Sequence, residues 1–226
     1  MKHTFLYIIV LNLGLTSCKS TKTLINTQVQ KPPQFAFFQV KSLKAINLEE
    51  ELTFADEVVL TYSLTSVDEN NKVVQVANGS WGVESMKAGQ VVLGDKFKTI
   101  ELKIPSKGRV LSSVVLTEID DYVKAQNMVK KINEFGGLGK IPAMFISLGE
   151  LETPLAVVFA SLQAAGIGLK AAEKFDQDDL LGQSTFDLNV STISDKQKMY
   201  PVNLIFDGEH LRNKFKYELN YELKIR

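Results

Sequence analysis

Acidic side chains gather at three places in the sequence, each beside a predicted β-strand. Asp56 and Glu57 precede the strand Val58–Leu64, a group closes the strand Val110–Ile119, and a third group stands shortly before Ser184–Val190. A helical hairpin between the last two groups would return their ends to one rim. Carboxylates that share a rim repel one another, and Ca²⁺, with about six to eight oxygen ligands, is the natural cation to neutralise them. The predicted calcium ligands are Asp56, Glu118, Asp120, Asp121, Asp176, Asp178 and Asp179.

Side chains that commonly carry out catalysis are scarce. The sequence holds two histidines, His3 and His210, and a single cysteine, Cys18. The polar stretch Asp207–His210 is typical of a hairpin turn, so we expect the His210 side chain to face solvent. No catalytic residue is predicted, and we expect a binding protein rather than an enzyme.

Length and charge limit the class of protein further. The 226 residues include 26 Lys and Arg balanced by 26 Asp and Glu, and 45% of the chain is apolar. Such a chain can bury a sizeable core. Zero net charge, without a basic run, argues against a nucleic-acid partner. One cysteine excludes an intramolecular disulfide and a cysteine-rich zinc site.

The N-terminal residues account for the lone cysteine. Met1-Lys2-His3 is a short basic start, and the mostly apolar run Phe5–Leu15 has about the length of a signal-peptide core. The run ends in Leu15-Thr16-Ser17-Cys18, which resembles the lipobox of a bacterial lipoprotein precursor. The resemblance implies that residues 1–17 are a signal peptide and that Cys18 carries diacylglycerol and a further chain such as palmitate. Several acyl chains anchor a protein firmly in a membrane.

Residues 18–34 are predicted to be a lipid anchor and a polar tether, stiffened at the end by Pro32-Pro33. Lys19, directly after the cysteine, makes the chain similar to lipoproteins sorted to the outer membrane. No acidic cluster of the kind that accompanies surface export follows it. We therefore expect a protein anchored in the bacterial outer membrane and facing the periplasm.

From residue 35 onward the sequence predicts a mainly β domain. Short β-branched and aromatic stretches recur about every ten residues, which is typical of an antiparallel β-sandwich. The last of them, Phe215–Ile225, alternates strictly between apolar and polar residues. That alternation indicates a strand with one buried face and one wet face.

Residues 121–175 interrupt the strands with helical character. Apolar residues from Ala125 to Ile132 recur at helical spacing and predict an amphipathic helix. Thr153-Pro154 is a typical helix start, and residues 154–169 are apolar on nearly all sides. This second helix either packs against the sandwich or inserts into a membrane.

Three stretches of the β domain resemble the C-two domain, an eight-stranded sandwich that binds lipid in a calcium-dependent way. The matching stretches are Leu43–Leu48 with Phe54–Val59, Val114–Asp120, and Asp178–Gly182. The resemblance covers residues 35–226. It implies an eight-stranded antiparallel β-sandwich, here with a helical hairpin inserted between late strands.

The resemblance also implies roles for particular acids. Asp56 corresponds to the second acid of the family's first loop, Glu118 and Asp120 to the paired acids of its third loop, and Asp179 to the late acid of that loop. Glu57 stands where the family has proline, and residues 121–175 lengthen the third loop.

Together these features predict a lipid-anchored envelope binding protein whose acidic rim binds calcium and presents the helical insertion to a protein or membrane partner. A first alternative is a metal-free structural lipoprotein that acts as a scaffold of an envelope or secretion complex. A second alternative is a protein that perturbs membranes with the apolar helix at residues 154–169.

Overall fold

The computed structural model describes residues 34–48, 55–119, 122–135, 156–158, 180–194, 196–210 and 213–226. All of them belong to the compact unit Pro33–Arg226. The predicted signal peptide, Cys18, the tether up to residue 33 and most of the helical insertion lie outside the described residues.

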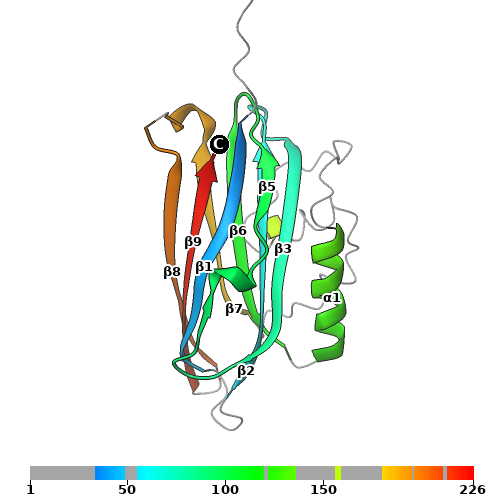
Figure 1. Cartoon of the computed structure of the whole chain (residues 1–226), viewed down its shortest axis with the longest axis vertical. Coiled ribbons are helices and arrows are strands. Elements are labelled where there is room, and N and C mark those ends of the chain that lie inside the picture. The colour runs from blue at the N-terminus through cyan, green and yellow to red at the C-terminus, as the bar shows by residue number, and fades with distance from the viewer. Residues whose placement is uncertain are drawn as a thin grey trace, which may run out of the picture. The chain divides into compact units, whose positions relative to one another are not determined.

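In the described part of the chain, nine strands form two antiparallel sheets that stack as a sandwich (Figure 1). Sheet A has the order β4-β1-β9-β8, with β5 also paired to β1, and sheet B has the order β3-β2-β6-β7. The predicted antiparallel β-sandwich is confirmed. The strands are β1 (Phe35–Asn47), β2 (Asp56–Val67), β3 (Val73–Met86), β4 (Val91–Leu93), β5 (Ile100–Lys103), β6 (Arg109–Glu118), β7 (Leu180–Asn189), β8 (Met199–His210) and β9 (Asn213–Ile225).

The nine described strands occupy eight positions. Strand β4 pairs with residues Ser42–Lys44 of β1, while β5 pairs with Phe35–Phe38 of the same strand. The 3-10 turn η1 (Gly94–Lys96) separates β4 from β5. Because β4 and β5 share one edge of β1, each sheet is four positions wide, as expected for an eight-stranded sandwich.

Alternating side chains build the core between the sheets. In β9 the apolar residues point inward, and Tyr221 is 1% exposed. The ring of Phe38 stacks on Tyr62 and on Tyr221, with centroid distances of 5.0 and 4.5 Å. Gly79 makes room for this stack, because a Cβ at that position would lie 2.4 Å from the Tyr62 ring. The core therefore joins β1 and β9 of sheet A to β2 and β3 of sheet B.

Glu222 is an exception on the wet face of β9, because only 7% of it is exposed. Its Oε1 lies 2.7 Å from Lys41 Nζ and 2.5 Å from Lys224 Nζ. Burial disfavours the charged carboxylate, but the hydrogen bonds from the two lysines outweigh that effect and hold the pKa of Glu222 below its ordinary value.

The polar stretch Asp207–His210 is not a turn, contrary to the prediction. These residues end strand β8, and the register pairs Asp207 with Lys216 and His210 with Asn213. The reason is that β9 begins at Asn213, so its first residues extend the ladder with β8 as far as His210. Polar residues are tolerated here because Asp207 and Glu209 lie on the exposed face of the strand.

Helix α1 (Tyr122–Phe135) lies along sheet B beside β3 (Figure 1). Its buried stripe confirms the predicted amphipathic helix. The residues in this contact are Ala125, Met128, Val129 and Ile132 of the helix and Val59, Val83 and Val115 of the sheet.

Residues 156–158 are the described part of the second predicted helix. Val157 packs with Val67 and Leu111, while Val158 joins the cluster beneath α1. Both valines are at most 5% exposed. At these residues the apolar side chains cover the sheet, which agrees with the packing interpretation. Among the described helices, none combines the length and hydropathy needed to cross a membrane.

Candidate functional site

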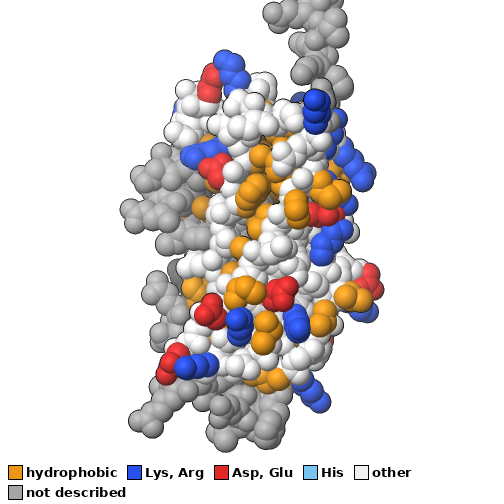
Figure 2. Space-filling view, turned by 90° about the vertical axis from the view of Figure 1, so that its left-hand side faces the viewer, with side chains coloured by type: hydrophobic (Ala, Val, Ile, Leu, Met, Phe, Trp, Pro, Cys, Tyr) orange, Lys and Arg blue, Asp and Glu red, His pale blue; other side chains and the backbone are white. Residues whose placement is uncertain are grey.

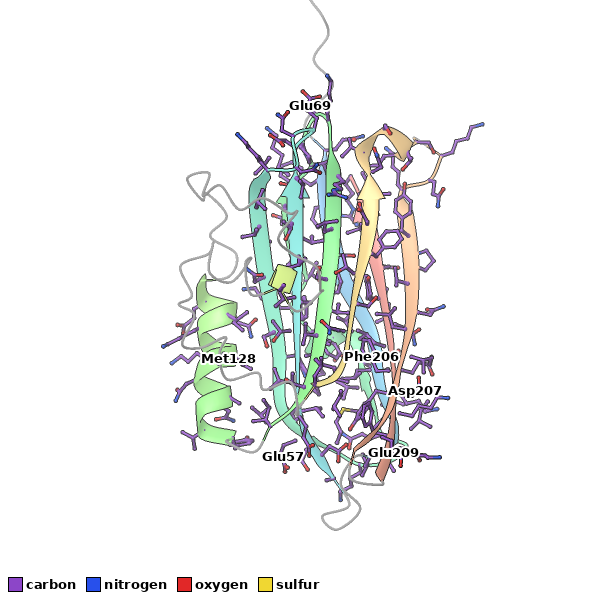
Figure 3. The ribbon with its side chains drawn as sticks, turned by 180° about the vertical axis from the view of Figure 1, so that it is seen from behind. Glu57, Glu69, Met128, Phe206, Asp207 and Glu209 are labelled. Atoms are coloured by element: carbon purple, nitrogen blue, oxygen red, sulfur yellow. The ribbon has the colours of Figure 1, made fainter. Side chains whose placement is uncertain are left out.

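One end of sheet B gathers the described acids of the predicted calcium site. Strand β2 begins there at Asp56, and β6 ends there, with Glu118 opposite Val58. Strand β7 also begins at this end, because Leu180 pairs with Thr117. We call this end the acidic rim. Figure 3 shows Glu57 and Glu209 at this end and Glu69 at the opposite one.

The rim also holds the points at which the helical insertion leaves and rejoins the sandwich. The backbone N–H of Ile119 donates to Glu57 O at 2.8 Å, which fixes the chain just after β6. Leu180, the first described residue after the insertion, lies on the neighbouring strand. The expected convergence of these ends is therefore observed for the described residues that border them.

Asp56 occupies the start of a strand rather than an open loop, and it is 0% exposed. The Tyr217 hydroxyl, on β9, donates a hydrogen bond of 2.5 Å to Asp56 Oδ2. This bond joins the two sheets at the acidic rim. One carboxylate oxygen of Asp56 is thus already engaged within the protein.

The described residues do not form a calcium site by themselves. They contain no group of three or more His, Cys, Asp or Glu residues placed to hold a metal ion. Asp56 and the half-buried Glu118 offer fewer oxygens than Ca²⁺ requires. The other predicted ligands, Asp120, Asp121, Asp176, Asp178 and Asp179, lie outside the described residues. Calcium binding stays a prediction.

A polar clamp fixes the helix to the edge of the sandwich. Asn133 Oδ1 accepts a hydrogen bond of 3.1 Å from the Ser80 backbone N–H, and Asn133 Nδ2 donates one of 2.9 Å to Ser80 O. Strand β3 is the edge of sheet B, so one side of its backbone is available to Asn133. Lys98 Nζ donates to the carbonyl of Asn133 at 2.5 Å.

The first turn of α1 keeps two apolar side chains in solvent. Tyr122 is 48% exposed and Val123 is 68% exposed. Gln126 Nε2 donates to the Tyr122 hydroxyl at 2.7 Å, which holds the ring against the first turn of the helix. We call Tyr122 and Val123 the apolar tip of α1. A helix that is held against the sheet and exposes apolar side chains in its first turn can serve as a recognition surface.

Two of these contacts were not predicted from the sequence. Tyr217 occupies an ordinary inward position of β9, and nothing local distinguishes it from Tyr221. Asn133 interrupts the apolar periodicity of α1 at a position that faces the sheet. A polar residue on the buried face of an amphipathic helix is the signal that could have identified it.

Comparison with known proteins gives a distant likeness. No protein-family model matches the sequence, and no curated protein matches it. Among solved structures, a C-two domain of plant Extended Synaptotagmin 1 aligns with a TM-score of 0.40 and 8% identity, over 87% of this chain and 97% of that one. Human GIVD cytosolic phospholipase A2, in complex with a methyl gamma-linolenyl fluorophosphonate inhibitor and terbium chloride, aligns with a TM-score of 0.39 and 8% identity, over 86% of this chain.

The chain spans 17% of the length of the phospholipase. At 8% identity neither match assigns a function to this protein. The described β-sandwich is established by its own strand pairing, and its function has to be inferred from its own side chains.

Proposed function

We propose that this chain is a lipid-anchored binding protein of the bacterial envelope, in which the β-sandwich holds helix α1 toward a protein partner. Cys18 would carry the lipid, and the sandwich would face the periplasm from the outer membrane. Its work is binding rather than catalysis. The observation that supports this proposal is the apolar tip of α1, which is exposed on a helix that the sandwich holds in place.

Fixing the helix favours binding because a preorganised surface loses little conformational freedom on association. Ile132 is 0% exposed beneath α1, and Asn133 makes two hydrogen bonds to the edge of sheet B. Exposed aromatic side chains such as Tyr122 frequently dominate the binding energy of protein interfaces.

Photo-crosslinking in intact cells tests this function. A photoreactive phenylalanine derivative replaces Val123 in one variant and Leu93 in a matched control, since these residues are 68% and 62% exposed. We expect an adduct with one defined envelope protein from position 123 and none from position 93. Equal adducts from both positions, or none from either, would contradict recognition through α1. Adducts with phospholipid from position 123 would favour a membrane over a protein as the partner of α1.

The anchor has a separate test. Cells that express the chain are fed an alkyne fatty acid, and the protein is compared with its Cys18→Ser variant. We expect label and membrane retention for the original sequence, and loss of both for the variant. A label that survives Cys18→Ser would refute lipidation at this cysteine.

Calcium binding at the acidic rim is a second proposal. It is supported by the register that brings Ile119 and Leu180, the neighbours of two predicted acidic groups, to the rim that holds Asp56 and Glu118. Isothermal titration with Ca²⁺ is repeated on Asp120→Asn and Asp179→Asn. If Ca²⁺ gives no heat of binding, or if neither substitution changes that heat, calcium does not bind at the acidic rim. A partner retained in chelator would then favour the metal-free scaffold.

A further inference from the structure

The strands of the sandwich run between two ends, and the chain enters at the end opposite the acidic rim. Strand β1 begins there, with Phe35 opposite Lys103 at the end of β5, and β9 finishes there, with Ile225 opposite Ala36. Figure 1 shows the C-terminus and the arrowhead of β5 at this end. The predicted tether, residues 18–34, precedes β1. We therefore call this end of the sandwich the tether end.

Backbone hydrogen bonds fix the point at which the chain enters. Phe35 N donates to Arg226 O at 2.6 Å, and Arg226 N donates to Phe35 O at 2.9 Å. Ile104 N donates to the carbonyl of Gln34, the last residue of the predicted tether, at 2.9 Å. Gln34 is thus held between the end of β9 and the segment that follows β5. Any restraint that a lipid anchor imposes through the tether therefore acts on this end of the sandwich.

The two ends of the sandwich carry opposite charge. At the tether end, residues 67–74, 103–109, 187–199 and 224–226 contain twice as many bases as acids. The bases are Lys72, Lys103, Lys107, Arg109, Lys196, Lys198, Lys224 and Arg226, and the acids are Asp68, Glu69, Asp187 and Asp195. At the acidic rim the described residues reverse this balance. The acids there are Asp56, Glu57, Glu84, Glu118, Asp207 and Glu209, and the bases are Lys87, Lys214 and Lys216.

The described acids of the tether end are already engaged within the protein. Glu69 lies 3.0 Å from Lys107, and Asp187 lies 3.0 Å from Arg109. Asp68 Oδ1 accepts hydrogen bonds of 2.8 and 2.9 Å from backbone N–H groups of the turn that follows it. The remaining charge that this end offers to a partner is therefore basic.

Large apolar side chains are exposed between these bases. Phe35 is 36% exposed, Val74 is 47% exposed and Met199 is 51% exposed. Each of them lies within two residues of a lysine or opposite one in the register. Figure 2, in which the tether end is uppermost, shows Lys and Arg side chains around this end with hydrophobic side chains between them. Apolar area together with positive charge is the combination that binds an anionic lipid surface.

We propose that the tether end rests on the anionic headgroups of the membrane that holds the lipid anchor, with the acidic rim pointing away from that membrane. The proposal rests on the anchor of the proposed function and goes beyond it by assigning the contact surface. The tether has seventeen residues, and an unstructured chain of that length spans about 23 Å on average. Strand β1, with 13 residues, separates the two ends by about 43 Å. An anchor at Cys18 therefore brings the tether end to the lipid more readily than the rim.

Charge selects the same orientation. A Lys or Arg near an anionic lipid surface strengthens the attraction about fivefold, and the effect disappears beyond a Debye length of about 8 Å at physiological salt. With the tether end on the membrane, its bases contribute this attraction, while the rim is too far away to repel the headgroups. With the rim on the membrane, its acids would meet anionic headgroups and the bases would be too distant to compensate.

Photo-crosslinking on vesicles tests this orientation. The full chain is purified with its anchor and reconstituted in vesicles of phosphatidylethanolamine and phosphatidylglycerol. A photoreactive phenylalanine derivative replaces Val74 in one variant and Val91 in a matched control, because these residues are 47% and 46% exposed. Val91 lies opposite Lys44, which is about 30 Å along β1 from Phe35 and near the rim.

We expect phospholipid adducts from position 74 to be at least roughly tenfold more abundant than those from position 91. The adduct from position 74 should decrease in vesicles of phosphatidylcholine and at about 1 M salt, because the attraction is electrostatic. Equal adducts from the two positions, or more from position 91, would overturn the proposal.

Flotation of the vesicles separates a failure of the contact from a failure of the anchor. A chain that floats with the vesicles but gives no adduct at position 74 refutes the contact alone. A chain that does not float refutes the anchor and the contact together.

Charge reversal gives a second, independent measurement. Lys103→Glu with Lys196→Glu reverses two exposed bases at the tether end, and Lys87→Glu with Lys216→Glu makes the same change of net charge at the rim. All four side chains are exposed, so the fold should survive and circular dichroism should be unchanged. We expect the first pair to lower the adduct from position 74 at least roughly tenfold, and the second pair to leave it unchanged.

The conservative pair Lys103→Arg with Lys196→Arg should keep the adduct from position 74, because it keeps the charge. An adduct that survives charge reversal at the tether end, or one that falls equally after charge reversal at the rim, would refute an electrostatic contact between the tether end and the membrane.

Discussion

Replacing Tyr217 by phenylalanine removes the hydroxyl that joins the two sheets at the acidic rim. The hydroxyl donates a 2.5 Å hydrogen bond to Asp56, whose side chain is fully buried. A hydrogen bond to a charged acceptor contributes roughly 1.5–3 kcal/mol, and its loss leaves a buried carboxylate with one donor fewer. We expect Tyr217→Phe to lower the free energy of unfolding by about 2 kcal/mol.

Two other buried tyrosines provide matched controls, because the same atom is removed from a similar environment. The Tyr62 hydroxyl donates to the backbone carbonyl of Lys98 at 2.6 Å, and the Tyr221 hydroxyl lies 3.2 Å from Ser112 Oγ. Both partners are neutral, so each substitution should cost about 1 kcal/mol. The charge of the acceptor should therefore make Tyr217→Phe the most destabilising of the three.

Urea unfolding of the purified full chain measures these differences. Trp81 is the single tryptophan, it is 8% exposed, and its ring lies 5.1 Å from that of Phe97, so its fluorescence reports the core. Equal slopes in urea would show that all variants unfold between comparable states. A loss for Tyr217→Phe no larger than that for Tyr221→Phe would refute the reasoning that a charged acceptor at Asp56 stabilises the rim.

Three further substitutions follow from the remaining contacts. Asn133→Ala removes both hydrogen bonds to Ser80 and should cost about 2 kcal/mol, with faster hydrogen exchange in α1. Asn127→Ala, at an exposed position of that helix, should leave hydrogen exchange in α1 unchanged. Equal effects of Asn127→Ala and Asn133→Ala on hydrogen exchange would contradict the clamp. Glu222→Gln should lower the urea midpoint at about pH 7, and this effect should shrink as the solution is made progressively more acidic than pH 4.5. The lowered pKa of Glu222 contributes stability that is complete above its ordinary value of 4.5 and is lost as pH falls through the folded-state pKa. Burial raises the pKa of Tyr221 from 10.0 to about 12, so stability should decline as pH rises through that interval. Tyr221→Phe should show a smaller alkaline decline, and an identical pH profile would argue against this assignment.

The local spacing of apolar residues sufficed to predict the architecture, because the architecture depends on which face of each strand or helix is apolar. The alternation in β9 and the helical spacing of Ala125, Met128 and Ile132 both describe buried faces that the structure contains. The same reasoning placed a turn at Asp207–His210, which is strand. Polar composition alone does not distinguish a turn from the wet face of a strand.

The two sheet edges show a different limit. Composition indicates neither that β4 and β5 share one edge of β1 nor that β8 ends the sheet. Edge position depends on strand order, and strand order depends on contacts between residues far apart in the chain. The edge position of β8 could therefore be established only once the order of sheet A was known.

By itself, the sequence determined the β-rich domain and the amphipathic helix, and it predicts lipid attachment at Cys18, since these depend on residues close together along the chain. Only the tertiary structure decided the partners of the acids. Asp56 is joined to Tyr217 across 161 positions, and Glu222 lies between Lys41 and Lys224 on adjacent strands. Whether a carboxylate faces water, a lysine or a buried hydroxyl is fixed by strand register across the sheets, and no short segment of the chain encodes that register.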